Sequence, residues 1–293
     1  MQATERFHAL SGLSLEDQHK VSLFGRGLKI DPPQRLIHEA FESIAAAHPS
    51  AIAAKCGHLN QNITYQQMDK AANRLSNHLI RLGLRPRQRV CLVVQRSVEM
   101  LVGIFAVLKA GCQYVPIDGG VTSEQALLHI LADTDARFIL CLPKLRDKVE
   151  QFAGPNALIL TLSMDIAASC PATKPIIHVL PQDGAYAIYT SGMYSNQPNY
   201  GPLSSLVGST GRPKGVDVSH GNVTNALLLE PARLGTTVGT KVAQVLSVGF
   251  DMGENQLEGI ENLADFSRRL GDTGVSHEWR HIDPARLRLE GHS

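Results

Sequence analysis

Short strand-like runs alternate with helix-like segments through residues 37–162, and this alternation constrains the fold more than any other feature of the sequence. Arg89 to Gln95 (RVCLVVQ) is rich in β-branched residues, which is typical of an interior strand. Val98 to Ala110 is apolar on nearly every face, which predicts a helix buried between layers. Because parallel strands need long crossover connections, the alternation predicts an α/β fold of layered, mostly parallel sheets with flanking helices.

The predicted elements begin and end at residues suited to those places. Ser123 is positioned as a helix N-cap, and Gly83 and Gly111 follow helices where a left-handed residue is expected. Pro116 lacks a backbone donor, which places residues 114–118 at a sheet edge or in a loop. Residues 5–33 are polar and weakly periodic, so we expect an arm or linker lying on the main domain. The expected helices are 37–47, 65–82, 98–110, 123–131, 144–152 and 220–229; the expected strands are 52–54, 63–65, 89–95, 114–118, 137–142, 157–162, 186–189, 216–219 and 242–251.

Residues 185–221 contain what looks like one phosphate-binding loop divided in two. Thr190-Ser191-Gly192 follows a short apolar strand, and Ser209-Thr210-Gly211-Arg212-Pro213-Lys214-Gly215 comes 16 residues later. A polyphosphate loop needs inward-pointing N–H groups, hydroxyl donors, glycines for close approach and a lysine as counter-charge. Either half alone could be an ordinary surface loop. The candidate phosphate-binding residues are Thr190, Ser191, Gly192, Ser209, Thr210, Gly211, Lys214 and Gly215.

Joining Gly192 to Ser209 gives YTSGSTGRPKG, which resembles the phosphate loop of the adenylate-forming (AMP-binding) superfamily. That superfamily includes acyl-CoA synthetases, luciferases and the adenylation domains of nonribosomal peptide synthetases. The interruption, residues 193–208, is rich in Ser, Asn, Pro and Gly, which indicates a loop. Codons for Gly192-Met193-Tyr194 and Val207-Gly208 can contain intron splice signals, so a retained intron is one origin for this insert.

Further segments resemble the successive amino-terminal motifs of peptide-synthetase adenylation domains. They are Ile63-Thr64-Tyr65 with Asp69, residues 72–75 (ANRL), residues 96–100 (RSVEM) and residues 108–118 (LKAGCQYVPID). We interpret them as helix faces, caps and turns that shape the domain without contacting substrate. The resemblance covers residues 35–252, and implies the incomplete amino-terminal lobe of an adenylate-forming enzyme.

The resemblance implies a ligase that activates a carboxylic acid with ATP, in nonribosomal peptide or related secondary metabolism. The loop residues would wrap the β- and γ-phosphates, with Mg²⁺ bridging the phosphates. Asp251, at the end of the apolar run 242–251, would bind the α-amino group of an amino-acid substrate, although a strand-end turn residue is the simpler alternative. Full-length relatives also work with a carrier-protein domain. The family's catalytic lysine belongs to a small carboxy-terminal domain, so no catalytic residue is assigned here.

After Met252 the resemblance stops, and residues 253–293 are expected to be a non-homologous tail. The predicted organisation is an arm at 1–34, a partial adenylation domain at 35–252 interrupted by 193–208, and this tail. We expect such a truncated chain to be inactive. The alternative is a catalytically dead nucleotide- or amino-acid-binding module, or a non-functional mis-spliced product.

Composition narrows the remaining classes. The formal net charge of the 293 residues is +1, which predicts neither a nucleic-acid partner nor a strongly charged polymer. The five cysteines form no CxxC pair, so we expect buried thiols rather than a metal site or disulfide framework. Neither a signal peptide nor a membrane span is apparent in the sequence, which favours a cytoplasmic location.

Overall fold

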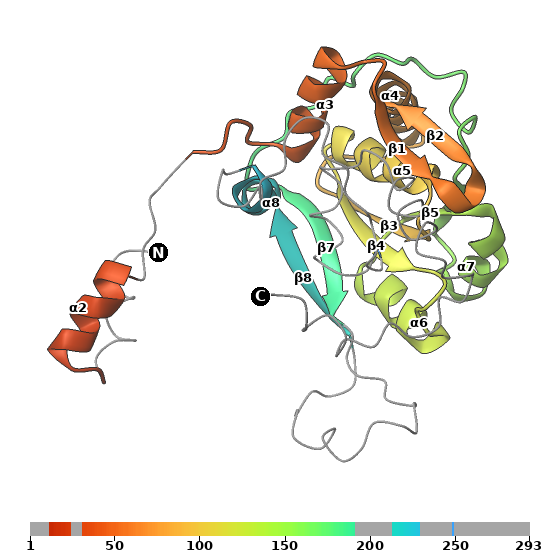
Figure 1. Cartoon of the computed structure of the whole chain (residues 1–293). Helices are drawn as coiled ribbons and strands as arrows, with labels where there is room; N and C mark the ends of the chain where they lie inside the picture. The colour runs from red at the N-terminus through yellow and green to blue at the C-terminus, as the bar shows by residue number, and fades with distance from the viewer. Residues whose placement is uncertain (1–11, 25–30, 191–212, 229–247, 249–293) are drawn as a thin grey trace, which may run out of the picture.

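The computed structural model describes residues 12–24, 31–190, 213–228 and 248. Its centre is a six-stranded sheet with the strand order β6-β5-β3-β4-β7-β8 (Figure 1). The first five of these strands run parallel, and β8 joins the edge antiparallel to β7. The prediction of a mostly parallel α/β sheet is therefore confirmed. The strands are β3 (Arg89–Val94), β4 (Gln113–Asp118), β5 (Phe138–Cys141), β6 (Leu158–Thr161), β7 (Gly184–Thr190) and β8 (Lys214–Ser219).

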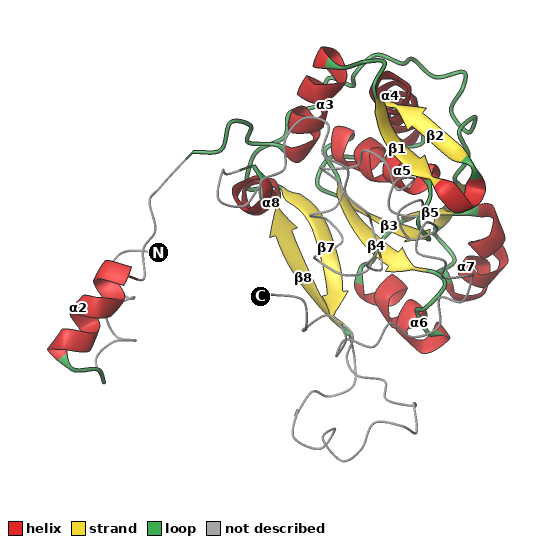
Figure 2. Cartoon of the chain, in the orientation of Figure 1, coloured by secondary structure: helices red, strands yellow, loops and turns green. Residues whose placement is uncertain are grey.

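Helices cover both faces of this sheet (Figure 2). The chain steps from β3 to β4 in one direction and from β4 to β5 and β6 in the other. Because parallel crossovers are right-handed, this reversal puts α5 on one face and α6 and α7 on the opposite one. The helices are α2 (Leu15–Phe24), α3 (Ile37–Ala47), α4 (Tyr65–Arg81), α5 (Val98–Lys109), α6 (Glu124–Asp133), α7 (Arg146–Phe152) and α8 (His220–Leu227), with short 3₁₀ turns at Gly57–Leu59 and Pro143–Leu145. A small hairpin of β1 (Ile52–Cys56) and β2 (Gln61–Thr64) completes the fold.

The core is the apolar layer expected between sheet and helices. Eleven of the twelve residues of α5 are buried, and β3 is buried from Val90 onward. The predicted caps are also present: Ser123 Oγ accepts the Ala126 N–H at 3.2 Å. Gly83 and Gly111 adopt φ values of 99° and 71°, the left-handed region that follows a helix.

One sequence-based expectation is wrong. Pro116 lies inside the sheet, opposite Leu92 of β3, rather than at an edge. The N–H groups of Gln113 and Gly119 donate toward β3. Because successive N–H groups along a strand point to opposite sides, an N–H at position 116 would point toward β7 instead. β4 pairs with β7 only at Tyr114. The missing donor of Pro116 therefore removes no ladder hydrogen bond. Within the expected arm, residues 15–24 form the helix α2 (Figure 1), and Leu15 is 84% exposed.

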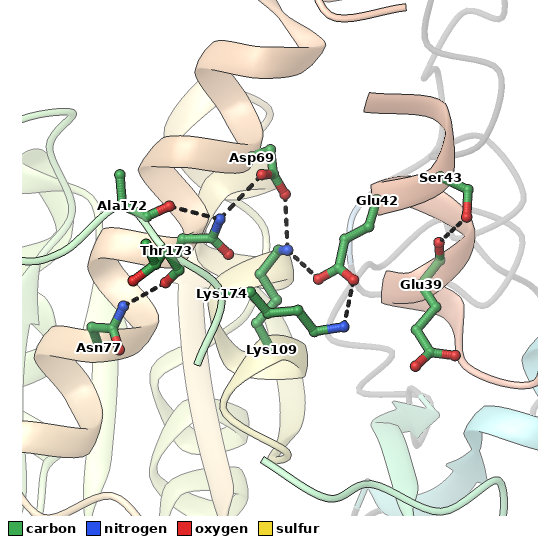
Figure 3. Close-up of polar contacts among 10 residues, drawn as sticks. Glu39, Glu42, Ser43, Asp69, Asn77, Lys109, Ala172, Thr173 and Lys174 are labelled. Carbon is green, nitrogen blue, oxygen red and sulfur yellow. Dashed lines mark hydrogen bonds and ion pairs between the residues drawn. The ribbon is translucent and has the colours of Figure 1, made fainter. Parts of the chain in front are cut away.

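A buried ion network joins α3, α4 and α5 (Figure 3). The ammonium of Lys109, at the end of α5, is fully buried between the carboxylates of Glu42 and Asp69. Lys174 binds the second oxygen of Glu42 at 2.6 Å. Two cations thus balance two carboxylates, which is the condition under which buried charge is tolerated.

Candidate phosphate-binding site

The structure pairs the two strands that flank the divided motif. β7 and β8 are adjacent antiparallel strands, and their register places Thr190 opposite Lys214 and Ile188 opposite Val216. The connection between the two strands comprises residues 191–213, which is 23 residues, and the insert accounts for 16 of them. The remaining seven residues, SGSTGRP, are of a length that joins two antiparallel strands. The insert therefore interrupts a single hairpin connection.

The candidate residues are only partly within the described chain. Thr190 ends β7, and Lys214 and Gly215 begin β8, where both are exposed. Sequence reasoning had assigned Lys214 and Gly215 to the loop rather than to a strand. The side chain of Thr190, the residues Ser191, Gly192, Ser209, Thr210 and Gly211, and Asp251 lie outside the described residues.

Helix α6 anchors both flanks of the loop, an arrangement that no sequence motif indicated. The hydroxyl of Tyr189 donates to the carboxylate of Asp133 at 2.5 Å. Nε2 of His129 lies 2.9 Å from the carbonyl oxygen of the buried Pro213. Partial burial and the neighbouring Asp133 raise the pKa of Tyr189, so its proton stays on the oxygen as a donor. The two contacts fix the residues on either side of the loop to one helix.

Gly215 shows why a glycine follows the lysine. A Cβ atom built on Gly215 would lie 3.0 Å from Cζ and 3.1 Å from the hydroxyl oxygen of Tyr189. The ring of Tyr189 thus covers the backbone of β8 at this point. A larger residue would push the ring off its contact with Asp133, so the glycine permits the close approach that the site needs.

A cavity of about 770 Å³ lies at the opposite end of β8 from Lys214. Its wall includes Arg89, Gln113 and Asp217, which form a closed polar cluster. Arg89 donates to both carboxylate oxygens of Asp217 at 3.0 Å, and Gln113 donates to one of them at 3.0 Å. This cluster braces the β8 edge and lies away from the divided loop.

The described residues contain no group of three or more His, Cys, Asp or Glu side chains that could hold a metal ion. All five cysteines are described; each is buried, as expected, and lies outside any disulfide. None of the described helices is both long and apolar enough to cross a membrane.

Comparison with known proteins agrees with the motif. The family model described as AMP-binding enzyme matches residues 41–193, so the match ends at the first residue of the insert. Adenylate-forming reductase 03009 of Coprinopsis cinerea is 32% identical over 93% of this chain and 25% of its own length. Tyrocidine synthase 3 of Brevibacillus parabrevis is 33% identical over 80% of this chain and 3% of its own length. The chain therefore spans about a quarter or less of these curated relatives.

Solved structures show the same fold. The crystal structure of the nonribosomal peptide synthetase FmoA3 (S1046A) is 25% identical, with a TM-score of 0.64, over 78% of this chain and 22% of that one. Its AMPPNP-bound form, at 24% identity and a TM-score of 0.67, shows likeness of fold. The family match, these relatives and the hairpin that carries the divided motif together show that the chain belongs to the AMP-binding enzyme family, as an amino-terminal piece of an adenylation domain of the peptide-synthetase type.

Proposed function

We propose that residues 35–252 derive from an adenylation domain that binds ATP and activates an amino acid or related carboxylic acid, and that the insert 193–208 blocks this activity in the present chain. The observation that supports the proposal most is the register of β7 and β8, which sets Thr190, at the end of one of the motif's flanking strands, opposite Lys214 of the other. Residues 1–34 and 253–293 flank this domain in the proposed organisation.

The described residues suit a polyphosphate. Lys214 is exposed at the start of β8, on the side of the sheet where the loop begins and ends. Beside it, Gly215 lets the Tyr189 ring pack directly against the backbone of β8, where a Cβ would meet the ring at 3.0 Å. In the proposed site the hydroxyls and N–H groups of residues 190–192 and 209–211 hold the β- and γ-phosphates, and Lys214 supplies a fixed positive charge. Mg²⁺, when bound with the nucleotide, would neutralise phosphate charge.

The reaction this arrangement would serve is a substitution at phosphorus. A carboxylate oxygen of the acid bonds to the α-phosphorus of ATP while the bond to the bridging oxygen breaks, giving an acyl-adenylate and pyrophosphate. The chain's own contribution is to hold the leaving phosphates in place and to stabilise their charge. Asp251 is the proposed partner of the substrate's ammonium group, and a carrier-protein domain of a longer protein is the proposed acceptor.

The amino-acid class has one specific support. The FmoA3 structure was also solved with α-methyl-L-serine-AMP, an amino-acid adenylate, and that form shares this fold at 23% identity with a TM-score of 0.68. The alternative, a binding module without catalytic activity, is favoured by the interrupted loop.

Deletion of residues 193–208 tests the proposal. We expect the parent chain to show no amino-acid-dependent exchange of pyrophosphate into ATP, and the deletion variant to bind ATP more tightly, as measured by calorimetry. In the deletion background, Lys214→Met should weaken ATP binding by roughly tenfold to a hundredfold, because it removes one charge-assisted contact. Lys144→Met is the matched control, since Lys144 is also exposed but lies in the 3₁₀ turn before α7. Pyrophosphate exchange by the parent chain, or equal ATP affinity before and after deletion, would refute the role given to the insert.

A further inference from the structure

Two buried histidines from distant parts of the sequence meet between α3 and α8. His38 is the second residue of α3 and is 3% exposed, and His220 is the first residue of α8 and is 0% exposed. Their ring centroids lie 5.4 Å apart with the planes at 73°, an edge-on contact. The described site does not use either ring, so the pair needs its own explanation.

His220 supplies a cap that α3 lacks in its own sequence. The N-cap residue of α3 is Leu36, whose side chain has no acceptor for the free N–H groups of the first turn. The N–H of Ile37 instead donates to Nδ1 of His220 at 3.4 Å. Because Nδ1 accepts, a neutral His220 carries its proton on Nε2. The first turn of one helix is thus completed by the first residue of another.

The pair has one unsatisfied polar atom on each ring. Nε2 of His220 and Nδ1 of His38 are both buried without a hydrogen-bond partner. Nε2 of His220 therefore offers a donor. Nδ1 of His38 can accept when His38 carries its own proton on Nε2, so one shared water or a small ring rotation would join the two atoms. A buried donor and acceptor in facing rings indicate a pair selected for its polarity, since two apolar side chains would fill the same space without this cost.

Burial keeps both rings neutral, and neighbouring charges add to this effect at His38. Burial, His220 and the ammonium groups of Lys174 and Lys109 hold the pKa of His38 well below its ordinary value. Burial lowers the pKa of His220 to about 4, against the opposing effect of the Asp183 carboxylate. Glu42, one turn after His38 on α3, binds both lysines (Figure 3) and so limits their effect on the pair. The beginnings of α3 and α8, each the positive end of a helix dipole, add to the preference for neutral rings.

The contact is connected directly to the phosphate-loop strand. β8 ends at Ser219 and α8 begins at His220, with no residue between them. The N–H of His220 donates to the carbonyl of Asp183 at 3.0 Å, and the N–H of Gly221 donates to the carbonyl of Pro181 at 2.7 Å. A displacement of α8 would therefore be transmitted to β8, which carries Lys214 at its other end.

We propose that His38 and His220 are positioning residues for the phosphate loop: they lock the first turn of α3 to the first turn of α8, and thereby hold β8 in register with β7. The consequence for nucleotide binding rests on the function proposed above. The lock itself is a property of the fold and can be tested without nucleotide.

Amide hydrogen exchange of the whole chain is the direct test. His220→Leu should speed exchange by about fivefold at the first turn of α3 and along β8, the effect of losing one helix cap, while β3 stays unchanged. In His220→Asn the side-chain oxygen can replace Nδ1 as the acceptor, so exchange at Ile37 should return toward the parent value. His48→Leu, at the exposed far end of α3, is the matched control and should change neither region.

The pH profile separates a positioning role from simple packing. The pKa of His220 falls from 6.5 toward about 4 when the ring is docked, so between those values the undocked ring takes up a proton that the docked ring does not. Lowering the pH from 7 to 4 should therefore speed exchange in β8 by up to about a hundredfold beyond the intrinsic change, and raising it should reverse this. In His220→Asn the part of this pH dependence that comes from His220 should be lost, leaving only the part that comes from the buried His38.

The outcomes decide the two proposals separately. Equal acceleration of β3 and β8 in His220→Leu, or no acceleration of β8, would refute the lock. If His220→Leu does not fold, an unchanged pH profile in His220→Asn would refute it instead. In the 193–208 deletion variant, His220→Asn should retain ATP affinity and His220→Leu should lose it. Equal ATP affinity in the deletion variant and in both of its His220 derivatives would refute the link to the loop. ATP binding by none of them would refute the proposed function and leave the exchange result standing.

Discussion

Replacement of Lys109 by methionine should lower the free energy of unfolding by about 3–5 kcal/mol, the cost of breaking a buried ion pair from one side. The Lys109 side chain is fully buried, and its ammonium lies 2.8 Å from Asp69 and in contact with Glu42. Methionine fills much of the same volume, so the loss is of charge rather than of packing. Lys174 would then be the remaining cation of the network. It is 47% exposed and pairs with Glu42, so Asp69 would lose its partner in the network.

Urea unfolding followed by far-ultraviolet circular dichroism measures this change. Glu150→Gln is the control, because it breaks the exposed pair of Arg146 and Glu150 in α7 and should change the free energy of unfolding by no more than about 0.5 kcal/mol. Adding Asp69→Asn to Lys109→Met should recover about 1–2 kcal/mol by removing one uncompensated charge. A Lys109→Met variant within about 0.5 kcal/mol of the parent, or no recovery in the double variant, would show that the network carries little energy.

Two further predictions concern the site and the core. Gly215→Ala should lower the free energy of unfolding, measured in urea, by about 1–3 kcal/mol, since the new Cβ meets the Tyr189 ring at 3.0 Å. Adding Tyr189→Leu should suppress that loss. An unchanged stability of Gly215→Ala would mean that the ring moves freely. Cys91 and Cys112, whose pKa values burial raises to about 12, should resist iodoacetamide at about pH 8 until urea unfolds the chain. Mass spectrometry that found either thiol alkylated at the rate of a free peptide cysteine would contradict the buried, protonated state.

Much of the fold was predictable because local patterns decided it. The burial of α5 follows from its apolar residues on every face, and Ser97 and Ser123 cap the helices that follow them. The break in the divided motif was also recognisable, because its two halves each keep the composition of one loop. In these stretches a residue's neighbours in sequence are enough to determine its conformation.

The remainder depended on contacts between distant residues. Tyr189 and Asp133 are 56 positions apart, and nothing near either residue indicates the other. The cap of Ile37 comes from a residue 183 positions later, and no residue near Leu36 in sequence indicates it. Pro116 was misplaced because the rule against interior proline assumes a full ladder on both sides, whereas β7 pairs with β4 at one residue pair only. Strand β8 likewise begins within the stretch that sequence reasoning treated as loop, because its pairing with β7 sets its start.

The hairpin explains how the fold can persist while its proposed function is lost. The cost of closing a connection grows as (3/2)RT times the logarithm of its length, so 23 residues in place of seven cost only about 1 kcal/mol more. Contacts at the ends of the connection and on its flanking strands oppose this cost: Tyr189 with Asp133, His129 with Pro213, and Arg89 with Asp217. Each is worth on the order of 1 kcal/mol. Strand pairing therefore tolerates the insert, whereas a phosphate cradle requires its two halves to be contiguous.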